Sequence, residues 1–502
     1  MRQLRPAGYA FLLEKYRLET IPNWHSSMVG SSGTRKLVIQ DGLVETTYPQ
    51  SYWPGDLDEN HLEFALKYDG INLATLALIF NVIDAGSLCD WIASKPTGKY
   101  ARKLWFLYEY LTGHQLPLPD LSQGNYIDLL ENKLYYTAAW LGRSELLQRQ
   151  RIFVNLPGGI SGFCPVVRRT ERLSELEQID IPERCREIVA AYPPELLKRA
   201  LSYLYRKETR ASFELEHLQP DSSRTEKFIA LLTKAEHRDF CEKELLIEIQ
   251  NSIVDYRYRD TDYRHNQNYV GETVTPFQEK IHYISPKPED LAGLMDGLVS
   301  VHKKLKREPA IPVVVHAAII SYGFVFLHPF EDGNGRLHRF LIHNILSQRG
   351  LVPEGLMFPV SAAMLNNPIL YERSLEAFSV PLLKLIDYEL DESGEMSVSG
   401  QTGIWYRCID MTVQVESLYE FILKTIDDEL KKELDFLVGY DSTKKALQEI
   451  VDMPDRQIDL FIRVCRQNKG RLSATKRASH FAALTDEEVE RMESAIRMNY
   501  AP

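Results

Sequence analysis

The sequence has few of the features that define several large classes of protein. Its six cysteines are scattered and no two form a C-x-x-C pair, so neither a disulfide framework nor a zinc site is expected. Free thiols favour a reducing compartment, and we expect a cytoplasmic protein. There is no internal repeat, no low-complexity tract and no excess of positive charge. A net charge of −11 argues against a protein that coats nucleic acid non-specifically.

Long apolar runs are also scarce. The apolar run near the N-terminus is interrupted by Glu14 and Lys15, so no secretory signal is expected. The longest apolar stretch, residues 311–327, contains His316 and Ser321 and leads directly into a charged loop. This pattern predicts a buried core helix, and no association with a membrane is expected.

What is present is the composition of a globular protein, with 44% hydrophobic and 26% charged residues. A chain of 502 residues exceeds one ordinary core, so two or three domains are expected. We predict an N-terminal domain of unknown role at 1–185, mixed but mostly helical. A helical domain should follow at 186–390 and a helical C-terminal domain at 400–502. Breaks in periodicity around Glu392-Ser393-Gly394 predict a linker between the last two.

The most informative segment is residues 328–339, HPFEDGNGRLHR. An apolar helix precedes it, and Leu337, Phe340 and Leu341 follow at helical spacing. Gly333, Asn334 and Gly335 therefore lie where a loop becomes the N-terminus of a helix. Two glycines let backbone N–H groups turn inward, and together with the helix dipole they form a cradle for an anion. Arg336 and Arg339 lie three residues apart on one helix face, where they can hold phosphate oxygens.

Two further side chains suit chemistry at a bound phosphate. Asp332 is a hard oxygen ligand of the kind that holds a Mg²⁺ bridging two phosphates. His328 can accept a proton from a hydroxyl that attacks phosphorus. Each feature alone has an ordinary structural explanation, since a histidine at a helix end is usually structural and Gly-Asn-Gly is often a turn. Their joint occurrence at this spacing favours a site for phosphoryl or nucleotidyl transfer.

The segment resembles the signature of the Fic family, H-x-F-x-(D/E)-G-N-G-R-x-x-R, at every defined position. The resemblance covers roughly residues 195–385. It implies a helical catalytic core that moves AMP from ATP to a Ser, Thr or Tyr hydroxyl of a protein. By resemblance His328 is the base, Asp332 the Mg²⁺ ligand, Gly333, Asn334 and Gly335 the anion hole, and Arg336 and Arg339 the ligands of the β- and γ-phosphates. The related Doc kinases have lysine in place of Gly335, which disfavours a kinase.

A second segment is similar to the Fic flap. It comprises Gln267, Asn268, Tyr269, Val270 and Gly271, with a proline-containing stretch at 283–288. The resemblance implies a short β-hairpin that docks the target protein by adding its backbone as a strand. The fold class expected is therefore mainly α, with a small hairpin flap in the helical core.

A third segment resembles the inhibitory motif (S/T)-x-x-x-E-(G/N) of this family, with Ser212 and Glu216 as its defined residues. The resemblance implies a helix near 209–217. Its Glu216 would pair with Arg339, occupy the place of the γ-phosphate and hold ATP in an unproductive pose. His217 replaces the small residue at the last position, which predicts a less close approach of this helix and weaker inhibition.

Several alternatives remain open at this stage. The same site could use another nucleotide or phosphocholine, or remove AMP, and the chain could act as an adaptor through its flanking domains. Six basic and no acidic residues fall between 461 and 480, which makes DNA contact an alternative. A solvated helical face is the favoured explanation there. The partner expected is a protein substrate with an exposed hydroxyl, and a homo-oligomer stays open.

Overall fold

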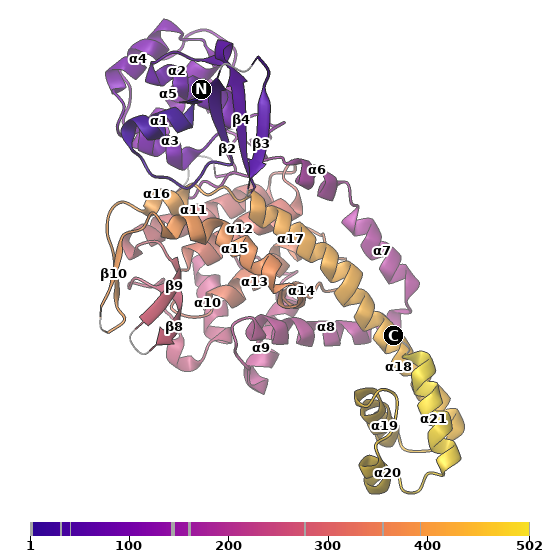
Figure 1. Ribbon diagram of the computed structural model, residues 1–502. Coiled ribbons are helices and arrows are strands. Elements are labelled where there is room, and N and C mark those ends of the chain that lie inside the picture. The colour runs from indigo at the N-terminus through magenta and orange to yellow at the C-terminus, as the bar shows by residue number, and fades with distance from the viewer. Residues whose placement is uncertain are drawn as a thin grey trace. The chain divides into compact units, whose positions relative to one another are not determined.

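The computed structural model describes residues 4–30, 33–40, 42–141, 146–158, 162–275, 278–353, 356–391 and 393–500. The chain forms two compact units, each assembled from separate stretches of sequence. Unit 1 comprises residues 1–179, 222–349 and 367–419, and unit 2 comprises residues 180–221, 350–366 and 420–502. Most elements are helices and the sheets are small, which confirms the expected mainly α class (Figure 1).

The first stretch of unit 1 packs five helices against a four-stranded sheet. The helices are α1 (Tyr9–Tyr16), α2 (Asp58–Phe64), α3 (Leu73–Phe80), α4 (Ala85–Ser94) and α5 (Lys99–Thr112). The strands are β1 (Arg5–Ala7), β2 (His25–Gly30), β3 (Lys36–Gln40) and β4 (Leu43–Pro49), in the order β1-β2-β4-β3. Only the β2–β4 pair is parallel. Leu104, Trp105 and Leu107 of α5 are almost fully buried in the core of this region.

Short elements connect this region to the rest of unit 1. A three-stranded sheet of β5 (Ile127–Asp128), β6 (Leu146–Leu147) and β7 (Ile152–Phe153) is followed by α6 (Glu171–Glu177), which Thr170 caps. The backbone N–H of Val166 donates to the carbonyl of Ile409, and that of Met411 donates to the carbonyl of Val166. These bonds connect the segment before the helical core with the segment after it, and so join the first and last stretches of unit 1.

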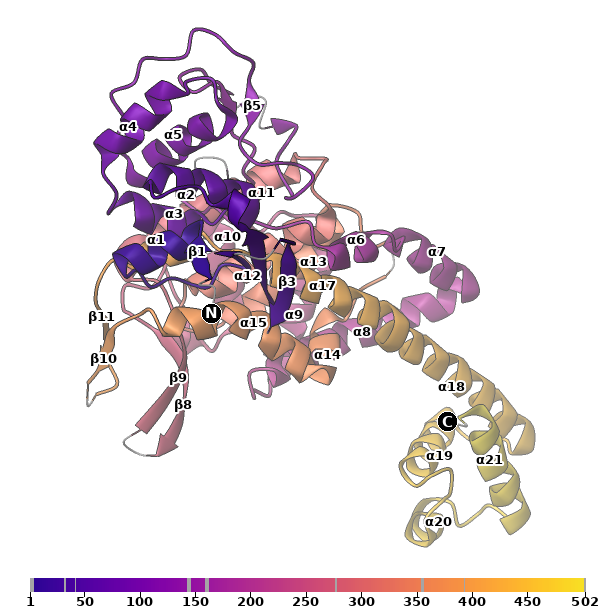
Figure 2. The ribbon, with the colours of Figure 1, turned by 45° about the horizontal axis from the view of Figure 1, so that its top comes forward.

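The helical core of unit 1 surrounds one strongly apolar helix, α12 (Val313–Leu327). Thirteen of its fifteen residues are buried, which confirms the core helix expected at 311–327. Around it lie α9 (Ser222–Lys234), α10 (Lys243–Ile253), α11 (Pro288–Lys306), α13 (Asn334–Gln348), α15 (Pro368–Leu383) and α16 (Gly403–Arg407). A 3-10 turn, η4 (Tyr256–Tyr258), leads into the hairpin β8 (Tyr269–Thr275) and β9 (Gln278–Ile284), which projects from the helices (Figure 2).

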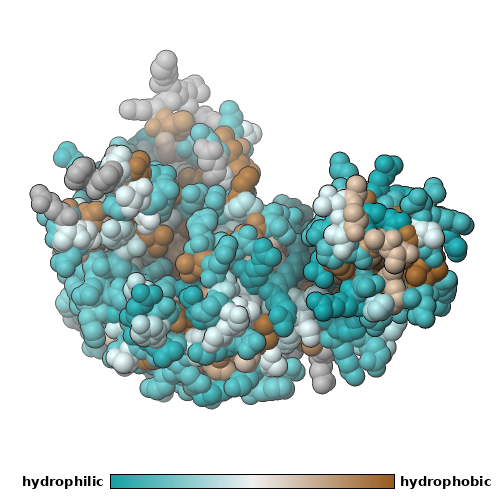
Figure 3. All heavy atoms as spheres, turned by 90° about the horizontal axis from the view of Figure 1, so that it is seen from below, coloured by the Kyte–Doolittle hydropathy of each residue, from teal (hydrophilic) through white to brown (hydrophobic). Residues whose placement is uncertain are grey.

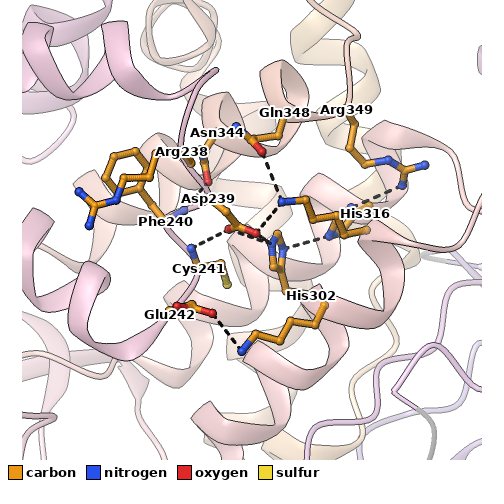
Figure 4. A network of polar contacts seen from close by, with 12 residues as sticks. Arg238, Asp239, Phe240, Cys241, Glu242, His302, His316, Asn344, Gln348 and Arg349 are labelled. Atoms are coloured by element: carbon orange, nitrogen blue, oxygen red, sulfur yellow. Dashed lines mark hydrogen bonds and ion pairs between the residues drawn. The ribbon is translucent and has the colours of Figure 1, made fainter.

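A buried chain of polar contacts holds α11 and α12 to the start of α10 and the end of α13 (Figure 4). Nε2 of His302 lies 3.1 Å from both carboxylate oxygens of Asp239, and Nδ1 of His302 lies 3.1 Å from Nε2 of His316. Nδ1 of His316 lies 3.4 Å from Nη1 of Arg349. Because the arginine can only donate and the carboxylate only accept, one arrangement satisfies every contact with both imidazoles neutral. Burial lowers the pKa of His316 well below its ordinary value, helped by His302 and Arg349.

The segment predicted as a linker contains the turn of a second small hairpin, which belongs to unit 1. Strands β10 (Tyr388–Leu390) and β11 (Met396–Val398) pair antiparallel. One carboxylate oxygen of Asp391 accepts the backbone N–H groups of Ser393 and Glu395, which closes a tight turn. Glu392, part of the same prediction, lies outside the described residues. Serine and glycine here form a turn between two short strands.

Unit 2 is built around two long helices, α8 (Pro194–Glu214) and α18 (Lys431–Ile450). Its other elements are α7 (Ile181–Ala191), α14 (Val360–Asn366), the π-helical turn η5 (Thr425–Leu430), α19 (Asp455–Gln467), α20 (Ala474–His480) and α21 (Asp486–Asn499). Helix α17 (Thr412–Lys424) begins in unit 1 and ends in unit 2. The last three helices and the end of α18 share a core of their own that includes Phe461, Phe481 and Met492.

A buried carboxylate joins two helices of unit 2. Glu208 of α8 accepts the backbone N–H of Ser361 at 2.8 Å and also the hydroxyl of Ser361, in the first turn of α14. A negative group at this end of a helix satisfies a donor that has no partner within the helix. Lys207 and Asn366 both contact the carboxylate of Glu429 in η5 at 2.7 Å. Helix α8 is thus fixed by polar contacts to α14 and to the helix that leads into α18.

No two of the six cysteines, all of which lie among the described residues, form a disulfide. Within the described ranges no single helix is long and apolar enough to cross a membrane, whereas the bent pair α3 and α4 passes that test by length and composition. The surface in Figure 3 is mostly hydrophilic, with hydrophobic residues in small separate groups. Scattered groups of this kind are ordinary on a protein surface.

Candidate functional site

The end of α12 places a histidine in an unusual backbone conformation. His328 is the C-cap of this helix, with φ 49° and ψ 58°, in the left-handed region that few non-glycine residues adopt. Its Nδ1 lies 3.1 Å from the carbonyl oxygen of Val325. A carbonyl only accepts, so Nδ1 carries the proton and Nε2 keeps its lone pair in the neutral ring. The ring is therefore oriented to accept a proton at Nε2.

The electrostatic surroundings keep this imidazole neutral. Burial is the largest cause that lowers the pKa of His328, to about 4. The contact with Val325 and the charge of Asp332 oppose the shift, while the charge of Arg264 adds to it. His328 is thus in the proton-accepting form near neutral pH, as a general base must be.

The loop after His328 turns into α13 through the predicted glycine-containing tripeptide. Gly333 caps the helix with φ 91°, and a Cβ there would lie 2.9 Å from Cγ1 of Val254. Both the backbone angle and the space therefore require glycine. The side-chain amide of Asn334 accepts the N–H of Phe330 at 3.0 Å and donates to its carbonyl at 2.7 Å. Asn334 thus closes the loop with its side chain, and the predicted anion cradle corresponds to the backbone N–H groups of the first helical turn.

The two arginines of the motif are both buried, and they differ in their contacts. Arg336 is fully buried and donates to the carboxylate of Asp332 at 2.6 Å and to the carbonyl of Ile253 at 3.0 Å. Nη1 of Arg339 lies 3.4 Å from the hydroxyl of Tyr371. Arg336 therefore ties the loop to the end of α10 and orients Asp332. Phosphate contacts of Gly335, Arg336 and Arg339 stay predictions.

The predicted flap segment lies at the base of the β8–β9 hairpin. Gln267 and Asn268 precede β8, while Tyr269, Val270 and Gly271 are its first residues. The side-chain amide of Asn268 donates to the carbonyl of Phe330 at 3.2 Å, so the hairpin is joined to the phosphate loop. Six of the seven residues of β8 are exposed, and among the described strands only β9 pairs with it. The outer edge of β8 is thus a surface to which an extended peptide can add.

Sequence reasoning missed the buried arginine that connects these parts. Arg264 donates to the carbonyls of His328 at 2.8 Å, Asn266 at 2.7 Å and Pro286 at 2.6 Å, and its backbone N–H donates to that of Pro329. Burial lowers the pKa of Arg264 to about 10, so it remains charged near neutral pH. It fixes the start of the loop to both ends of the hairpin. The only signal in the sequence was its place in a very polar stretch after α10.

Two more side chains contact the loop. They are the carboxylate of Asp260, after α10, and the amide of Gln250, within α10. Oδ2 of Asp260 accepts the backbone N–H of Glu331 at 3.3 Å and the side-chain N–H of Gln250 at 3.0 Å. The same amide of Gln250 also lies 3.3 Å from the carbonyl oxygen of Asp332. The loop that holds the predicted anion site is therefore braced by side chains about seventy to eighty residues upstream.

The residues of the predicted brake belong to unit 2. Ser212 is buried in the last turn of α8, the helix ends at Glu214, and Glu216 lies in the turn beyond it. His217 has φ 55°, and the N–H of Leu218 donates to the carbonyl of Phe213. This is the left-handed helix end at which glycine and asparagine are favoured. The preference for a small residue there thus has a backbone cause that the sequence interpretation overlooked. The pairing of Glu216 with Arg339 stays a prediction.

The donor set suits Mg²⁺ only in combination with a phosphate-bearing substrate. Within the described residues no group of three or more His, Cys, Asp or Glu side chains could hold a metal. Asp332 is partly exposed beside the cradle, and Mg²⁺ is commonly held by one or two carboxylates together with substrate phosphates. Asp332 therefore fits the group as its one protein ligand, and the ion would neutralise phosphate charge there.

Fold and site together define a mainly helical protein in which a glycine-containing loop, a neutral histidine and an exposed hairpin lie around one apolar helix. Residues 240–346 match the model of the Fic/DOC family. The match contains the loop, the hairpin and helices α11 and α12 entire.

Comparison with curated proteins gives relatives that match a fraction of the chain. The protein adenylyltransferase Fic of Culex quinquefasciatus is 30% identical over 126 residues, which is 24% of this chain and 22% of that protein. The proteins of the same name in Drosophila virilis and Drosophila melanogaster are 35% and 36% identical over 96 residues. These cover 18% of this chain and 17% and 16% of the relatives. The chain thus spans about a fifth of the length of the curated relatives it matches.

Two solved structures share more of the chain but with low similarity. A Fic family protein from Desulfovibrio desulfuricans G20 is 18% identical with a TM-score of 0.36, and covers 66% of this chain and 88% of its own. A Fic domain containing signaling protein from Bacteroides thetaiotaomicron is also 18% identical, with a TM-score of 0.35 and coverage of 53% and 97%. At such scores the likeness carries no argument about detail.

Proposed function

We propose that the Fic/DOC domain transfers AMP from ATP to a hydroxyl of a protein substrate. The observation that carries this proposal is the contact of Nδ1 of His328 with Val325, which leaves Nε2 unprotonated beside the N-terminus of α13. Relatives that match a fraction of the chain are named protein adenylyltransferases, which supports the choice of AMP. We also propose that the protein acts in the cytoplasm, since its six scattered cysteines form no disulfide among the described residues.

The reaction needs little beyond positioning and one base. The phosphates lie against the N–H groups of the first turn of α13, where the helix dipole favours negative charge. The hydroxyl oxygen of the target bonds to the α-phosphorus, and the bond from that phosphorus to the bridging oxygen of the β-phosphate breaks. Pyrophosphate leaves, and the hydroxyl proton passes to Nε2 of His328. The edge of β8 holds the target backbone so that its hydroxyl faces the phosphorus.

A labelling experiment tests the activity. The protein is incubated with Mg²⁺ and ATP labelled on the α-phosphate, alone and with a cell lysate as a source of targets. His328→Ala should reduce labelling by about 100-fold or more, the usual contribution of a general base. His237→Ala, at an exposed histidine outside the loop and the hairpin, is the matched control and should label like the wild type. Label transferred only from the γ-phosphate would show a kinase and would overturn the proposal.

We further propose that Glu216 restrains this activity by pairing with Arg339. Support comes from its sequence motif, in which Ser212 and Glu216 lie four residues apart at the end of α8. A carboxylate on Arg339 would exclude the γ-phosphate, because both bind the guanidinium in the same way. Glu216→Gly should raise labelling, and Glu214→Gly, two residues earlier, is the control expected to leave it unchanged. No gain with Glu216→Gly would refute the brake but leave the activity standing.

A further inference from the structure

The turn between α19 and α20 and the residues on either side of it carry positive charge that the catalytic proposal does not use. Helices α19 and α20 form a helix-turn-helix on the small core at the C-terminal end of the chain. Between residues 461 and 480 there are six basic and no acidic residues, in a chain whose net charge is −11. Such a concentration of one charge in an acidic protein marks a place for an anionic partner.

The turn between the two helices is well defined. Lys469 and Gly470 both have positive φ, 51° and 80°, and the N–H of Gly470 donates to the carbonyl of Cys465 at 2.8 Å. The N–H of Leu472 donates to the carboxylate of Glu493 in α21 at 2.7 Å, and the hydroxyl of Ser473 caps α20. The angle between α19 and α20 is therefore set by specific bonds, so the surface is preformed.

Two of the six cations have structural partners. The guanidinium of Arg466 lies over the rings of Phe436 and Tyr500, at 4.3 Å and 4.7 Å from their centres. Arg477 donates to the backbone carbonyls of Phe481 and Leu484 and pairs with Asp486. Both side chains hold the small domain together, and neither is needed to explain the charge of the surface.

The other four cations are exposed, and the described residues offer them no ion pair. They are Arg463 at the end of α19, Lys469 and Arg471 in the turn, and Lys476 in α20. No residue of α20 is buried, so the whole outer side of this helix is accessible. Thr475 and Ser479 add exposed hydroxyls on the same short helix. This surface, named here the basic turn, consists of Arg463, Lys469, Arg471 and Lys476.

We propose that the basic turn binds double-stranded DNA through its phosphates, with α20 in the major groove. A helix of seven residues is about 10 Å long, and a major groove about 12 Å wide admits it. The flanking cations then face the phosphates on either side, while the major groove of double-stranded RNA is too deep and narrow for such a helix. Four phosphate contacts predict sequence-tolerant binding that falls steeply with salt.

The test uses the full-length chain and a short fluorescent DNA duplex, with binding followed by anisotropy. For four contacts the slope of log K against log salt should be about −3.6, a loss of roughly 100-fold between about 50 and 200 mM salt. Neutralising the basic turn (Arg463→Gln, Lys469→Gln, Arg471→Gln and Lys476→Gln together) should abolish binding. The control removes four other exposed lysines of unit 2, Lys198→Gln, Lys431→Gln, Lys432→Gln and Lys445→Gln, with the same change of net charge, and should bind like the wild type.

Three results would overturn the proposal. The first is no binding to DNA at low salt, and the second is an equal loss of binding in both quadruple variants. The third is tighter binding to an RNA duplex of the same length, or to vesicles containing phosphatidylserine, than to DNA. Circular dichroism and thermal unfolding of each variant establish that it is folded, which exposed substitutions should not change. Labelling by the catalytic domain is a separate measurement, so failure here leaves the proposed function untouched.

Discussion

His328 combines a strained backbone with an imidazole that stays neutral, and its environment sets the pH range of the reaction. The strained conformation is typical of residues held in place for function. Burial lowers its pKa to about 4, so the ring remains unprotonated well below the ordinary titration range of histidine.

This shift predicts the pH dependence of transfer. The base is the neutral ring, so kcat/KM should stay level from about pH 8 down to about pH 6 and fall only at lower pH, toward the pKa of about 4. The measurement is the initial rate of labelling at subsaturating ATP across this range. An acid limb with its midpoint near the ordinary histidine value, about 6.5, would contradict the neutral buried ring.

His217 provides a prediction about stability. A φ of 55° lies in the left-handed region of the backbone. For most residues with a Cβ this conformation lowers the free energy of unfolding by about 1 kcal/mol relative to a residue that tolerates it. Asparagine tolerates it better, so His217→Asn should raise the free energy of unfolding by about 0.5–1 kcal/mol.

Thermal unfolding of the full chain measures the effect of His217→Asn. The control is His237→Asn, a surface histidine without positive φ, which should leave the midpoint unchanged. A lower midpoint for His217→Asn would mean that the imidazole makes a contact worth more than the strain.

At the residue scale, the sequence predicted the site residues that follow one another along the chain and missed the residues that contact them from distant positions. The motif from His328 to Arg339 could be interpreted because its parts follow one another at fixed spacing. Arg264 and Gln250 contact the same loop from positions 64 and 82 residues away, and neither belongs to a local pattern. Arg336 was predicted from its spacing to face phosphate, whereas its burial and its contact with Ile253 arise from the packing of α10 on α13.

At the scale of the elements, the packing of α8 depends on the hydrogen bonds that its Glu208 accepts from α14. The Glu208 carboxylate is fully buried and accepts two hydrogen bonds from Ser361, and bonds to a charged group contribute about 1.5–3 kcal/mol each. Glu208→Ala should therefore lower the free energy of unfolding by about 2–4 kcal/mol and increase hydrogen exchange in α14. Ser361→Ala removes one of the two bonds and should have a smaller effect. Equal stability of wild type and Glu208→Ala would contradict this role.

The hairpins show where element-level prediction succeeded and where it failed. The hairpin at β8 and β9 was expected from family resemblance, because its composition alone indicates only a polar loop. The hairpin at β10 and β11 was missed because its strands have three residues each and its turn contains serine and glycine. Short strands leave no periodic pattern, and their pairing depends on an Asp391 turn that resembles a linker in composition.

For the molecule as a whole, buried histidines predict sensitivity to mild acid. Burial lowers the pKa of His61 to about 4 and of His338 to about 3, and that of His316 well below its ordinary value. In the unfolded chain each titrates near about 6.5, so below that pH the unfolded state binds more protons than the folded state. Stability should be constant above neutral pH and fall as pH decreases, by up to about 1.4 kcal/mol per pH unit for each histidine.

Urea unfolding of the full chain at a series of pH values measures this dependence. We expect the stability to decrease between about pH 6.5 and 5.5 with a slope that approaches four protons, because His328, whose pKa is also lowered to about 4, adds to these three histidines. The variant His61→Asn should reduce the slope by about one proton, provided that it folds. A stability that is flat over this interval would show that these histidines are protonated in the folded state.

The composition of the two units could not be deduced from the sequence. Unit 2 joins residues 180–221, 350–366 and 420–502, and unit 1 contains the stretches between them. Composition and breaks in periodicity identify boundaries along a chain, and such features do not indicate which distant segments pack together. The predicted domain limits at 185, 390 and 400 therefore stay predictions about continuous segments.

Helix α18 has a further consequence, because it is a common neighbour of the two regions for which regulation and DNA binding are proposed. Asp435 of α18 contacts Tyr192, just before α8, and Asp441 contacts Arg199 within α8. Tyr440 of α18 bonds to Asp459 of α19. If a ligand bound at one end of α18 shifts this helix and so changes the affinity for a ligand at the other end, the second ligand must change the affinity for the first by the same factor. DNA that loosened the brake would raise affinity for ATP, and ATP would then raise affinity for DNA by the same factor. The fraction of the protein bound to DNA would thus increase with the concentration of ATP.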